Sequence, residues 1–249
     1  MTDKNLYTDL CAAKSRGEKR LAVLLDPDKV RLKRMAEAIE LSVECGVDYF
    51  FIGGSLVVNN LLDTLLTNLH EHAPQIPQIL FPGNSFQLSY RADGLLFLSL
   101  ISGRNADLLI GQHVISAPYL RISPLEILST GYILVDGGVP TTVQYMSNTY
   151  PIPFAKDDIA VCTAMAGEML GLKLMYMDAG SGAQRPISAS MIEAVSTAIS
   201  VPLIVGGGIQ TAEKCAENVR AGADIIVVGN AIEHDPSLIR EMAAAVHGK

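Results

Sequence analysis

The chain has 249 residues, of which 49% are hydrophobic, and its formal net charge is −7. The length is typical of a single TIM barrel, and the acidic balance, with no basic cluster to offset it, argues against nucleic-acid binding. No apolar run approaches the roughly 20 residues that span a bilayer, and the polar N-terminus shows no signal peptide. We therefore expect a cytoplasmic protein without a transmembrane segment.

Short apolar runs alternate with longer helical patterns along the chain, which is typical of βα units on a parallel sheet. Their hydrophobicity is continuous, as in strands buried on both faces. We predict an α/β fold, a (β/α)₈ TIM barrel in one domain over residues 1–249, with residues 1–20 as an N-terminal helical extension. An eight-stranded open sheet is the alternative. The predicted strands are Leu21–Leu25, Asp48–Ile52, Gln78–Phe81, Leu95–Leu98, Tyr132–Val135, Leu174–Met177, Pro202–Val205 and Asp224–Val228.

Helices are predicted between these strands, although they are uneven. The segment Pro82–Gly94 is short, so the helix expected there is shortened or replaced by a loop. Asp136–Lys156 is rich in Gly, Pro, Thr and Asn, which predicts a flexible loop at the active-site end of the barrel. The clearest helical patterns lie at Val30–Cys45, Asp157–Leu170, Ala189–Ile199 and Thr211–Ala221.

Cysteine and histidine do not indicate a metal centre in this sequence. The four cysteines are scattered with no CxxC pair, which is typical of reduced, structural thiols. Only His70 and His72 are close together, and their i, i+2 spacing does not place both side chains on one helix face. We therefore expect no zinc site.

Two glycine-containing turns near the C-terminus indicate a phosphate site. The run VPLIVGGGI predicts strand seven followed by a glycine turn at Gly207 and Gly208, and Gly229 and Asn230 end strand eight. Backbone N–H groups in such turns can face an anion, and the loops after strands seven and eight recur as the phosphate site of TIM barrels. The alternative is that the glycines only form a tight turn. The reaction type is not indicated, because many barrel enzymes share this feature.

The sixth predicted strand ends in YMDAGSGA, which brings a phenol, a carboxylate and a small-residue turn together. Asp178 is a candidate general base toward a substrate hydroxyl, or a hydrogen-bond acceptor for it. Ser181 and the neighbouring amides can extend the phosphate site. The alternative is that Asp178 caps the next helix.

A second polar group follows the first two predicted strands. Asp26 and Asp28 follow strand one and Ser55 follows strand two, a set of hard oxygen ligands suited to Mg²⁺. This ion takes one or two protein ligands together with waters and substrate phosphates. That these residues cap the helices that follow is an equally weighted alternative.

Taken together, the motifs resemble those of geranylgeranylglyceryl phosphate synthases over about Leu21–Asp235. The archaeal-type branch is the closer one, because the bacterial heptaprenyl branch has Lys where this chain has Leu24. Asp178 is a departure, since the family generally has Glu there. The motifs, in chain order, are LLDPDK, FIGGS, LFPGNSFQLSYRADGLLFLSLISGRN, GYILVDGG, YMDAGSGA, VGGGI and VGNAI.

The resemblance implies a Mg²⁺-dependent prenyltransferase of ether-lipid biosynthesis. In this reaction the C3 hydroxyl of sn-glycerol 1-phosphate attacks C1 of geranylgeranyl diphosphate and pyrophosphate leaves. It implies Asp178 and Tyr176 as catalytic residues, Asp26 and Ser55 as Mg²⁺ ligands, and an apolar groove for the prenyl tail. The implied glycerol-phosphate site consists of Tyr176, Met177, Asp178, Ala179, Gly180, Ser181, Gly182, Gly207, Gly208, Gly229 and Asn230.

Other functions stay open on the sequence alone. A phosphosugar isomerase or an indole-glycerol-phosphate type of barrel would need an acid/base pair across strands one and five, for which Asp26 and Asp136 are the candidates. A non-catalytic barrel that binds a phosphorylated metabolite is a further alternative, favoured only by the shorter Asp178. A prenyl donor of another length would keep the same site. We also expect a homo-oligomer, a dimer or a larger even-numbered ring, because barrels of this kind often assemble through their outer helices.

Overall fold

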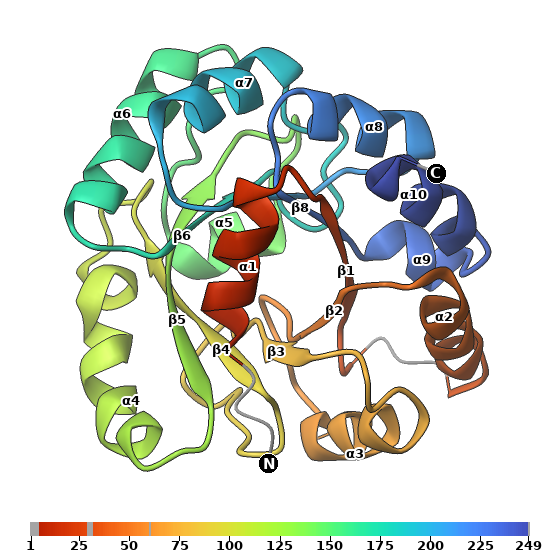
Figure 1. Cartoon of the computed structure of the whole chain (residues 1–249). Coiled ribbons are helices and arrows are strands. Elements are labelled where there is room, and N and C mark those ends of the chain that lie inside the picture. The colour runs from red at the N-terminus through yellow and green to blue at the C-terminus, as the bar shows by residue number, and fades with distance from the viewer. Residues whose placement is uncertain (1–4, 29–31, 60, 249) are drawn as a thin grey trace.

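Eight parallel strands close into a barrel surrounded by helices (Figure 1). The computed structural model of the chain describes residues 5–28, 32–59 and 61–248. Because β1 pairs with both β2 and β8, the predicted barrel is confirmed and the open sheet is excluded. The strands are β1 (Arg20–Leu25), β2 (Tyr49–Ile52), β3 (Gln78–Leu80), β4 (Gly94–Leu100), β5 (Glu126–Leu134), β6 (Leu174–Asp178), β7 (Leu203–Gly206) and β8 (Ile225–Val228).

Helices between the strands form the outer layer of the fold. Those predicted at Asp157–Leu170, Ala189–Ile199 and Thr211–Ala221 match α6, α7 and α8, while Val30 and Arg31 of the first predicted helix lie outside the described residues. None of the helices in the described part of the chain is long and apolar enough to cross a membrane. The helices are α1 (Leu6–Ser15), α2 (Leu32–Cys45), α3 (Leu62–His72), the π-helical turn η1 (Asp107–Gly111), α4 (Gln112–Arg121), α5 (Thr142–Ser147), α6 (Asp157–Met169), α7 (Ala189–Ala198), α8 (Ala212–Arg220), α9 (Asn230–His234) and α10 (Leu238–His247).

The core has two layers, because successive side chains of a strand point to opposite faces of the sheet. Phe51, Leu96 and Tyr176 belong to the cluster that fills the barrel interior. Phe50 and Met177, which are neighbours of two of these residues in sequence, pack between the sheet and the helices. The alternation therefore places Tyr176 and Asp178 of β6 on the inner face, and Met177 on the outer one.

Aspartates close the N-terminal end of the barrel. Each directly precedes one strand and accepts a hydrogen bond from a backbone N–H at the start of the preceding strand in the chain, so neighbouring strands are tied together where they begin. The pairs are Asp48 with Leu21 N at 2.8 Å, Asp93 with Gln78 N at 2.8 Å and Asp224 with Leu203 N at 3.0 Å.

Helix α1 lies across this same end (Figure 1). Leu6 and Leu10 are buried in the cluster that fills the barrel. The Glu126 carboxylate accepts hydrogen bonds from the backbone N–H groups of Leu6 at 2.5 Å and Tyr7 at 2.9 Å, and so satisfies N–H groups that a helix start leaves without partners. The described part of the predicted N-terminal extension is thus a helix that covers the bottom of the barrel.

Two loops at the other end differ in how well the sequence predicts them. Residues 81–93, all of them described, contain no helix, as expected from their short length. The prediction of a flexible loop at Asp136–Lys156 is wrong in part, because the segment contains the helix α5. It is also tied to the barrel, since Ile152 N donates to Leu134 O at 2.8 Å and Asn105 Nδ2 donates to Ser147 O at 2.7 Å.

Candidate active site

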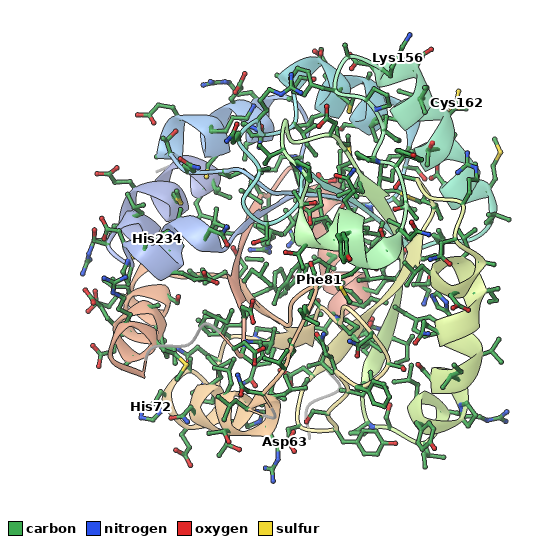
Figure 2. All side chains as sticks on the ribbon, turned by 180° about the vertical axis from the view of Figure 1, so that it is seen from behind. Asp63, His72, Phe81, Lys156, Cys162 and His234 are labelled. Carbon is green, nitrogen blue, oxygen red and sulfur yellow. The ribbon has the colours of Figure 1, made fainter. Side chains whose placement is uncertain are left out.

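A cavity of about 580 Å³ lies at the C-terminal ends of the strands. It faces the viewer in Figure 2, where Phe81, one of its lining residues, is labelled near the middle of the barrel. Met177 and Ala179 do not line it, because their side chains are buried between the sheet and the helices. Every other predicted site residue does: Asp26, Ser55, Tyr176, Asp178, Gly180, Ser181, Gly182, Gly207, Gly208, Gly229 and Asn230.

Asp178 is the buried carboxylate of this cavity, with 7% of its surface exposed. Its Oδ2 accepts a hydrogen bond from the Tyr132 hydroxyl at 2.5 Å, and its Oδ1 accepts one from Gly180 N at 2.7 Å. Burial raises the pKa of Asp178, although the hydrogen bonds from Tyr132 and Gly180 act in the opposite direction. A carboxylate with a raised pKa that faces a cavity is a candidate general base.

Three aromatic rings meet beside Asp178. Tyr176 stacks on Phe81, with 5.1 Å between ring centroids, and meets Tyr132 edge-on at 5.5 Å. Tyr176 is buried, and its hydroxyl lies against Gly206, where a Cβ would stand 2.7 Å from the phenol oxygen. Burial raises the pKa of Tyr176 well above its usual value, so the phenol stays neutral.

No local sequence pattern distinguishes Tyr132 as a site residue. The sequence predicts it only as the start of an apolar strand, whereas β5 begins six positions earlier, at Glu126. Register then places Tyr132 opposite Tyr176 on the neighbouring strand. Knowledge of that register, together with the inward direction of Tyr176, would have identified it.

The glycine turns form the polar end of the cavity. Gly207 and Gly208 both have positive φ, +82° and +70°, and consecutive residues in such conformations can turn their N–H groups toward one anion. The Ser181 hydroxyl donates a hydrogen bond to Asn230 Oδ1 at 3.1 Å, which joins the loop after β6 to the start of α9. The loops predicted to hold phosphate therefore come together around one space.

Asp26 and Ser55 lie on another wall of the same cavity. Gly54 stands against the Asp26 carboxylate, where a Cβ would come within 3.0 Å of Oδ2, so the ends of β1 and β2 are in close contact. Asp28 has a different role, since its carboxylate accepts hydrogen bonds from Val58 N and from Asn59 N, the latter at 2.9 Å. Burial by itself raises the pKa of Asp28, but together these hydrogen bonds outweigh it and the pKa is lowered. Asp28 thus fastens the loop after β2.

Gln87 is a second residue that the sequence did not reveal. Its side chain is buried, its Oε1 accepts hydrogen bonds from Gly54 N at 3.3 Å and Gly83 N at 3.2 Å, and its Nε2 donates to Gly54 O at 2.9 Å. One amide therefore joins the loops after β2 and β3 directly beside Ser55. Nothing in the local pattern distinguishes this glutamine from an exposed loop residue.

The remainder of the cavity extends over β4 toward η1, α4 and α5, and most of the side chains that β4 contributes to it are apolar. Polar residues also line this part, namely Asn105, Asp107, Gln112, His113, Ser116, Thr142 and Ser147. This part, called here the apolar arm, belongs to the same cavity as the polar end. It is lined by Leu88, Leu95, Phe97, Leu98, Leu100, Leu108, Leu120, Val143 and Met146.

The comparisons with known proteins agree with this geometry. The model of the PcrB family matches residues 14–246. The chain belongs to the PcrB family. A geranylgeranylglyceryl phosphate synthase from Chitinophaga pinensis is 57% identical over 242 residues, which cover 97% of this chain and 96% of that protein. One from Thermococcus kodakarensis is 41% identical over 217 residues, covering 87% and 85%.

A solved structure leads to the same family. The (S)-3-O-geranylgeranylglyceryl phosphate synthase from Thermoplasma acidophilum, crystallised with its substrate sn-glycerol-1-phosphate, superposes with a TM-score of 0.91 at 26% identity. The match covers 98% of this chain and 99% of that one. The resemblance inferred from the motifs is confirmed, and this member of the PcrB family is an enzyme, a prenyltransferase.

Asp136, the second catalytic residue that the isomerase alternative requires, lies outside the cavity of this PcrB-family protein. Asp136 does not line the cavity and instead forms an exposed ion pair with Arg185 at 3.1 Å. Asp136 therefore does not supply the second group of an acid/base pair in this cavity. The polar end of the cavity and the apolar arm together suit a phosphorylated acceptor and a hydrocarbon donor.

Proposed function

We propose that the enzyme transfers the geranylgeranyl group of geranylgeranyl diphosphate to the C3 hydroxyl of sn-glycerol 1-phosphate. The observation that carries this proposal is the joining of a glycine-rich polar end and an apolar arm in one cavity. The names of the relatives and the substrate of the Thermoplasma acidophilum structure support it. Holding both reactants in one cavity removes much of the entropic cost of bringing them together.

The polar end binds the acceptor in this proposal. The turn at Gly207 and Gly208, with the loops that carry Ser181 and Asn230, offers backbone N–H groups and side-chain donors for the phosphate of glycerol phosphate. Asp178 then faces the glycerol hydroxyls. The net charge of −7 gives no general attraction for an anion, so the phosphate is held by these local donors.

Asp178 acts as the general base. It takes the proton of the C3 hydroxyl while the C3 oxygen forms a bond to C1 of the donor, the bond from C1 to the diphosphate oxygen breaks, and pyrophosphate leaves with that electron pair. The carboxylate is ionised before the step and protonated after it. Tyr176 packs beside the acceptor as a neutral phenol and shapes the floor of the site.

Asp26 and Ser55 are the proposed Mg²⁺ ligands. The fit rests on the donor set, one half-buried carboxylate and one hydroxyl that line the cavity from adjacent strand ends. The described part of the chain has no group of three His, Cys, Asp or Glu that could hold a metal ion by itself. Such a sparse set suits Mg²⁺, which takes its remaining ligands from water and substrate phosphates. A bound Mg²⁺ would neutralise charge on the leaving diphosphate.

The test is product formation by the purified protein with Mg²⁺, sn-glycerol 1-phosphate and a series of donors from C15 to C35. We expect a prenylglyceryl phosphate, with the C20 donor preferred, and no product after addition of EDTA. A preference for a donor of another prenyl chain length would change the assigned donor but not the proposed reaction. The absence of turnover with every donor would contradict the proposed function.

The Asp26→Ala variant tests the metal site within that assay. Loss of the Mg²⁺-dependent rate, with retained affinity for glycerol phosphate, is the expected result. Asp158→Ala, which removes an exposed carboxylate on α6, is the matched control and should behave as wild type. An Asp26→Ala enzyme with the wild-type dependence on Mg²⁺ would place the ion elsewhere.

We further propose that the protein is a homo-oligomer that assembles through its outer helices. Helix α4 supports this, because Val114, Ile115 and Tyr119 are each more than half exposed on its surface, and Ile122 beyond its end is 77% exposed. Light scattering coupled to size exclusion gives the mass in solution. A monomer at micromolar concentration would contradict the proposal. The cytoplasmic location stays a prediction from the sequence.

A further inference from the structure

Tyr132 lines the cavity and packs against two other aromatic rings. It is 5% exposed and projects from β5 into the barrel, opposite Tyr176 in the register of β5 and β6. Its ring meets Tyr176 edge-on and lies 6.1 Å from the ring of Phe81. With the ring packed in this way, the Tyr132 hydroxyl donates its hydrogen bond to Asp178.

The Asp178 carboxylate is oriented by two donors from different elements. Oδ2 accepts from Tyr132 on β5 at 2.5 Å, and Oδ1 accepts from Gly180 N in the loop after β6 at 2.7 Å. Of the two tyrosines beside it, only Tyr132 forms this bond, because the Tyr176 hydroxyl lies against Gly206 of β7. A carboxylate has about four sites for accepting hydrogen bonds, so the acceptor substrate can still reach this one.

We propose that Tyr132 is the positioning residue of the base: its hydroxyl orients the Asp178 carboxylate toward the acceptor and keeps it ionised in a buried site. The inference rests on the proposed role of Asp178. A family member with the usual Glu would reach one methylene further into the cavity. With the shorter Asp178, orientation of the carboxylate depends more strongly on its partner from β5.

Tyr132 is the side chain that hydrogen-bonds to the Asp178 carboxylate and affects its pKa. On β6 itself the neighbour of Asp178 is Tyr176, whose phenol is neutral. On the side of β7 its neighbours are Gly206 and, just beyond the strand, Gly207, which carry no titratable group. Among the described residues, the pKa of Asp178 is set by burial and by the hydrogen bonds from Tyr132 and Gly180, with no Lys or Arg among these causes. Burial raises this pKa, and the Tyr132 hydroxyl opposes the rise by stabilising the ionised form.

The first test is Tyr132→Phe, which removes only the hydroxyl. We expect kcat to fall about tenfold to a hundredfold, as for the loss of a hydrogen bond to a charged group, with KM for glycerol phosphate changed less than about twofold. The acidic limb of the pH profile should move to higher pH, because the base then titrates at a higher pKa. Tyr49→Phe, which removes the hydroxyl of another buried tyrosine in the same core, is the control.

A second variant covers the case in which Tyr132→Phe does not fold. A 3-fluorotyrosine at position 132 keeps the shape of the ring but makes the hydroxyl a stronger donor, so the acidic limb should move to lower pH. An acidic limb that stays in place in both variants, or a Tyr132→Phe enzyme with the wild-type kcat, would overturn the inference.

Asp178→Asn separates this inference from the proposed function on which it rests. If Asp178→Asn is as active as wild type, the base assignment itself is wrong. If Asp178→Asn is inactive and Tyr132→Phe behaves as wild type, Asp178 remains the base and only the role of Tyr132 fails. A carbon-13 NMR titration of labelled aspartate gives the pKa of Asp178 directly in each folded variant, without any turnover.

Discussion

Gly207 lies so close to Asp178 that a Cβ added to the glycine would stand 2.4 Å from the Oδ1 of the carboxylate. It would also stand 2.6 Å from Ala179 N and 2.7 Å from Gly180 N. The glycine turn after β7 is therefore packed directly against the base at the end of β6. A methyl group at this position must displace the carboxylate or the loop that binds it.

We predict that Gly207→Ala lowers kcat by at least about a hundredfold, because small misplacements of a reacting group cost this much. Gly171→Ala is a matched control, since Gly171 has a similar φ of +85° and no atom within 4 Å of the added Cβ. Both variants should lose about 1–2 kcal/mol of stability from the strained backbone. Equal activity in the two enzymes would show that the contact between Gly207 and Asp178 is unimportant.

The hydrogen bond between Ser181 and Asn230 gives a prediction for acceptor binding. Ser181→Ala removes a neutral hydrogen bond worth about 0.5–1.5 kcal/mol, so KM for sn-glycerol 1-phosphate should rise about two- to tenfold. Steady-state kinetics at saturating donor measure this. Ser15→Ala, at an exposed serine of α1, should leave KM unchanged. An unchanged KM in Ser181→Ala would remove the loop after β6 from the acceptor site.

Gln87 gives a prediction for the proposed metal and donor side. Gln87→Leu removes the hydrogen bonds that the N–H groups of Gly54 and Gly83 donate to this side chain, which are worth about 0.5–1.5 kcal/mol each. Because Ser55 follows Gly54, the Mg²⁺ concentration for half-maximal rate should rise, with a smaller effect on KM for the acceptor. Gln75→Leu at an exposed position is the control. A change in KM for the acceptor without a change in the Mg²⁺ dependence would contradict the proposed metal site at Asp26 and Ser55.

A substitution of Glu126 is expected to lower the stability of the protein without changing its activity. Glu126→Ala removes the carboxylate that binds the start of α1, so we expect the free energy of unfolding to fall by about 1–3 kcal/mol. The residue lies at the opposite end of the barrel from the cavity, so kcat at low temperature should be unchanged. Denaturant titration and kinetics test the two statements, with the exposed Glu241→Ala as control. A stable variant would show that α1 is held by its apolar contacts alone.

The strands could be predicted because each parallel strand is buried on both faces and forms a continuous apolar run. Residues at strand ends, such as Asp26 and Asp178, could be predicted as site residues because the carboxyl ends of parallel strands meet at one end of the barrel. The ends of a strand are harder to predict where polar or small residues interrupt its apolar run. In β5 this happens at the Ser-Thr-Gly stretch that ends at Gly131.

The remaining site residues depend on long-range contacts that leave no local pattern. Tyr132 reaches Asp178 only through the register of two strands, and Gln87 acts through the backbone of a loop that precedes it by more than thirty positions. The segment that contains α5 has the composition of a loop, and its attachment comes from Ile152, which bonds to the backbone of Leu134. Such contacts form only when the barrel closes.

Closure of the barrel also limits the ways in which this protein can bind another chain. Because β1 pairs with β8, the barrel presents no row of unpaired backbone N–H and C=O groups along an outer strand. Strand exchange, edge-to-edge aggregation and the addition of a peptide as an extra strand therefore have no template on this sheet. Recognition between subunits has to be encoded in side chains, and single substitutions on the outer helices can change it without disturbing the fold.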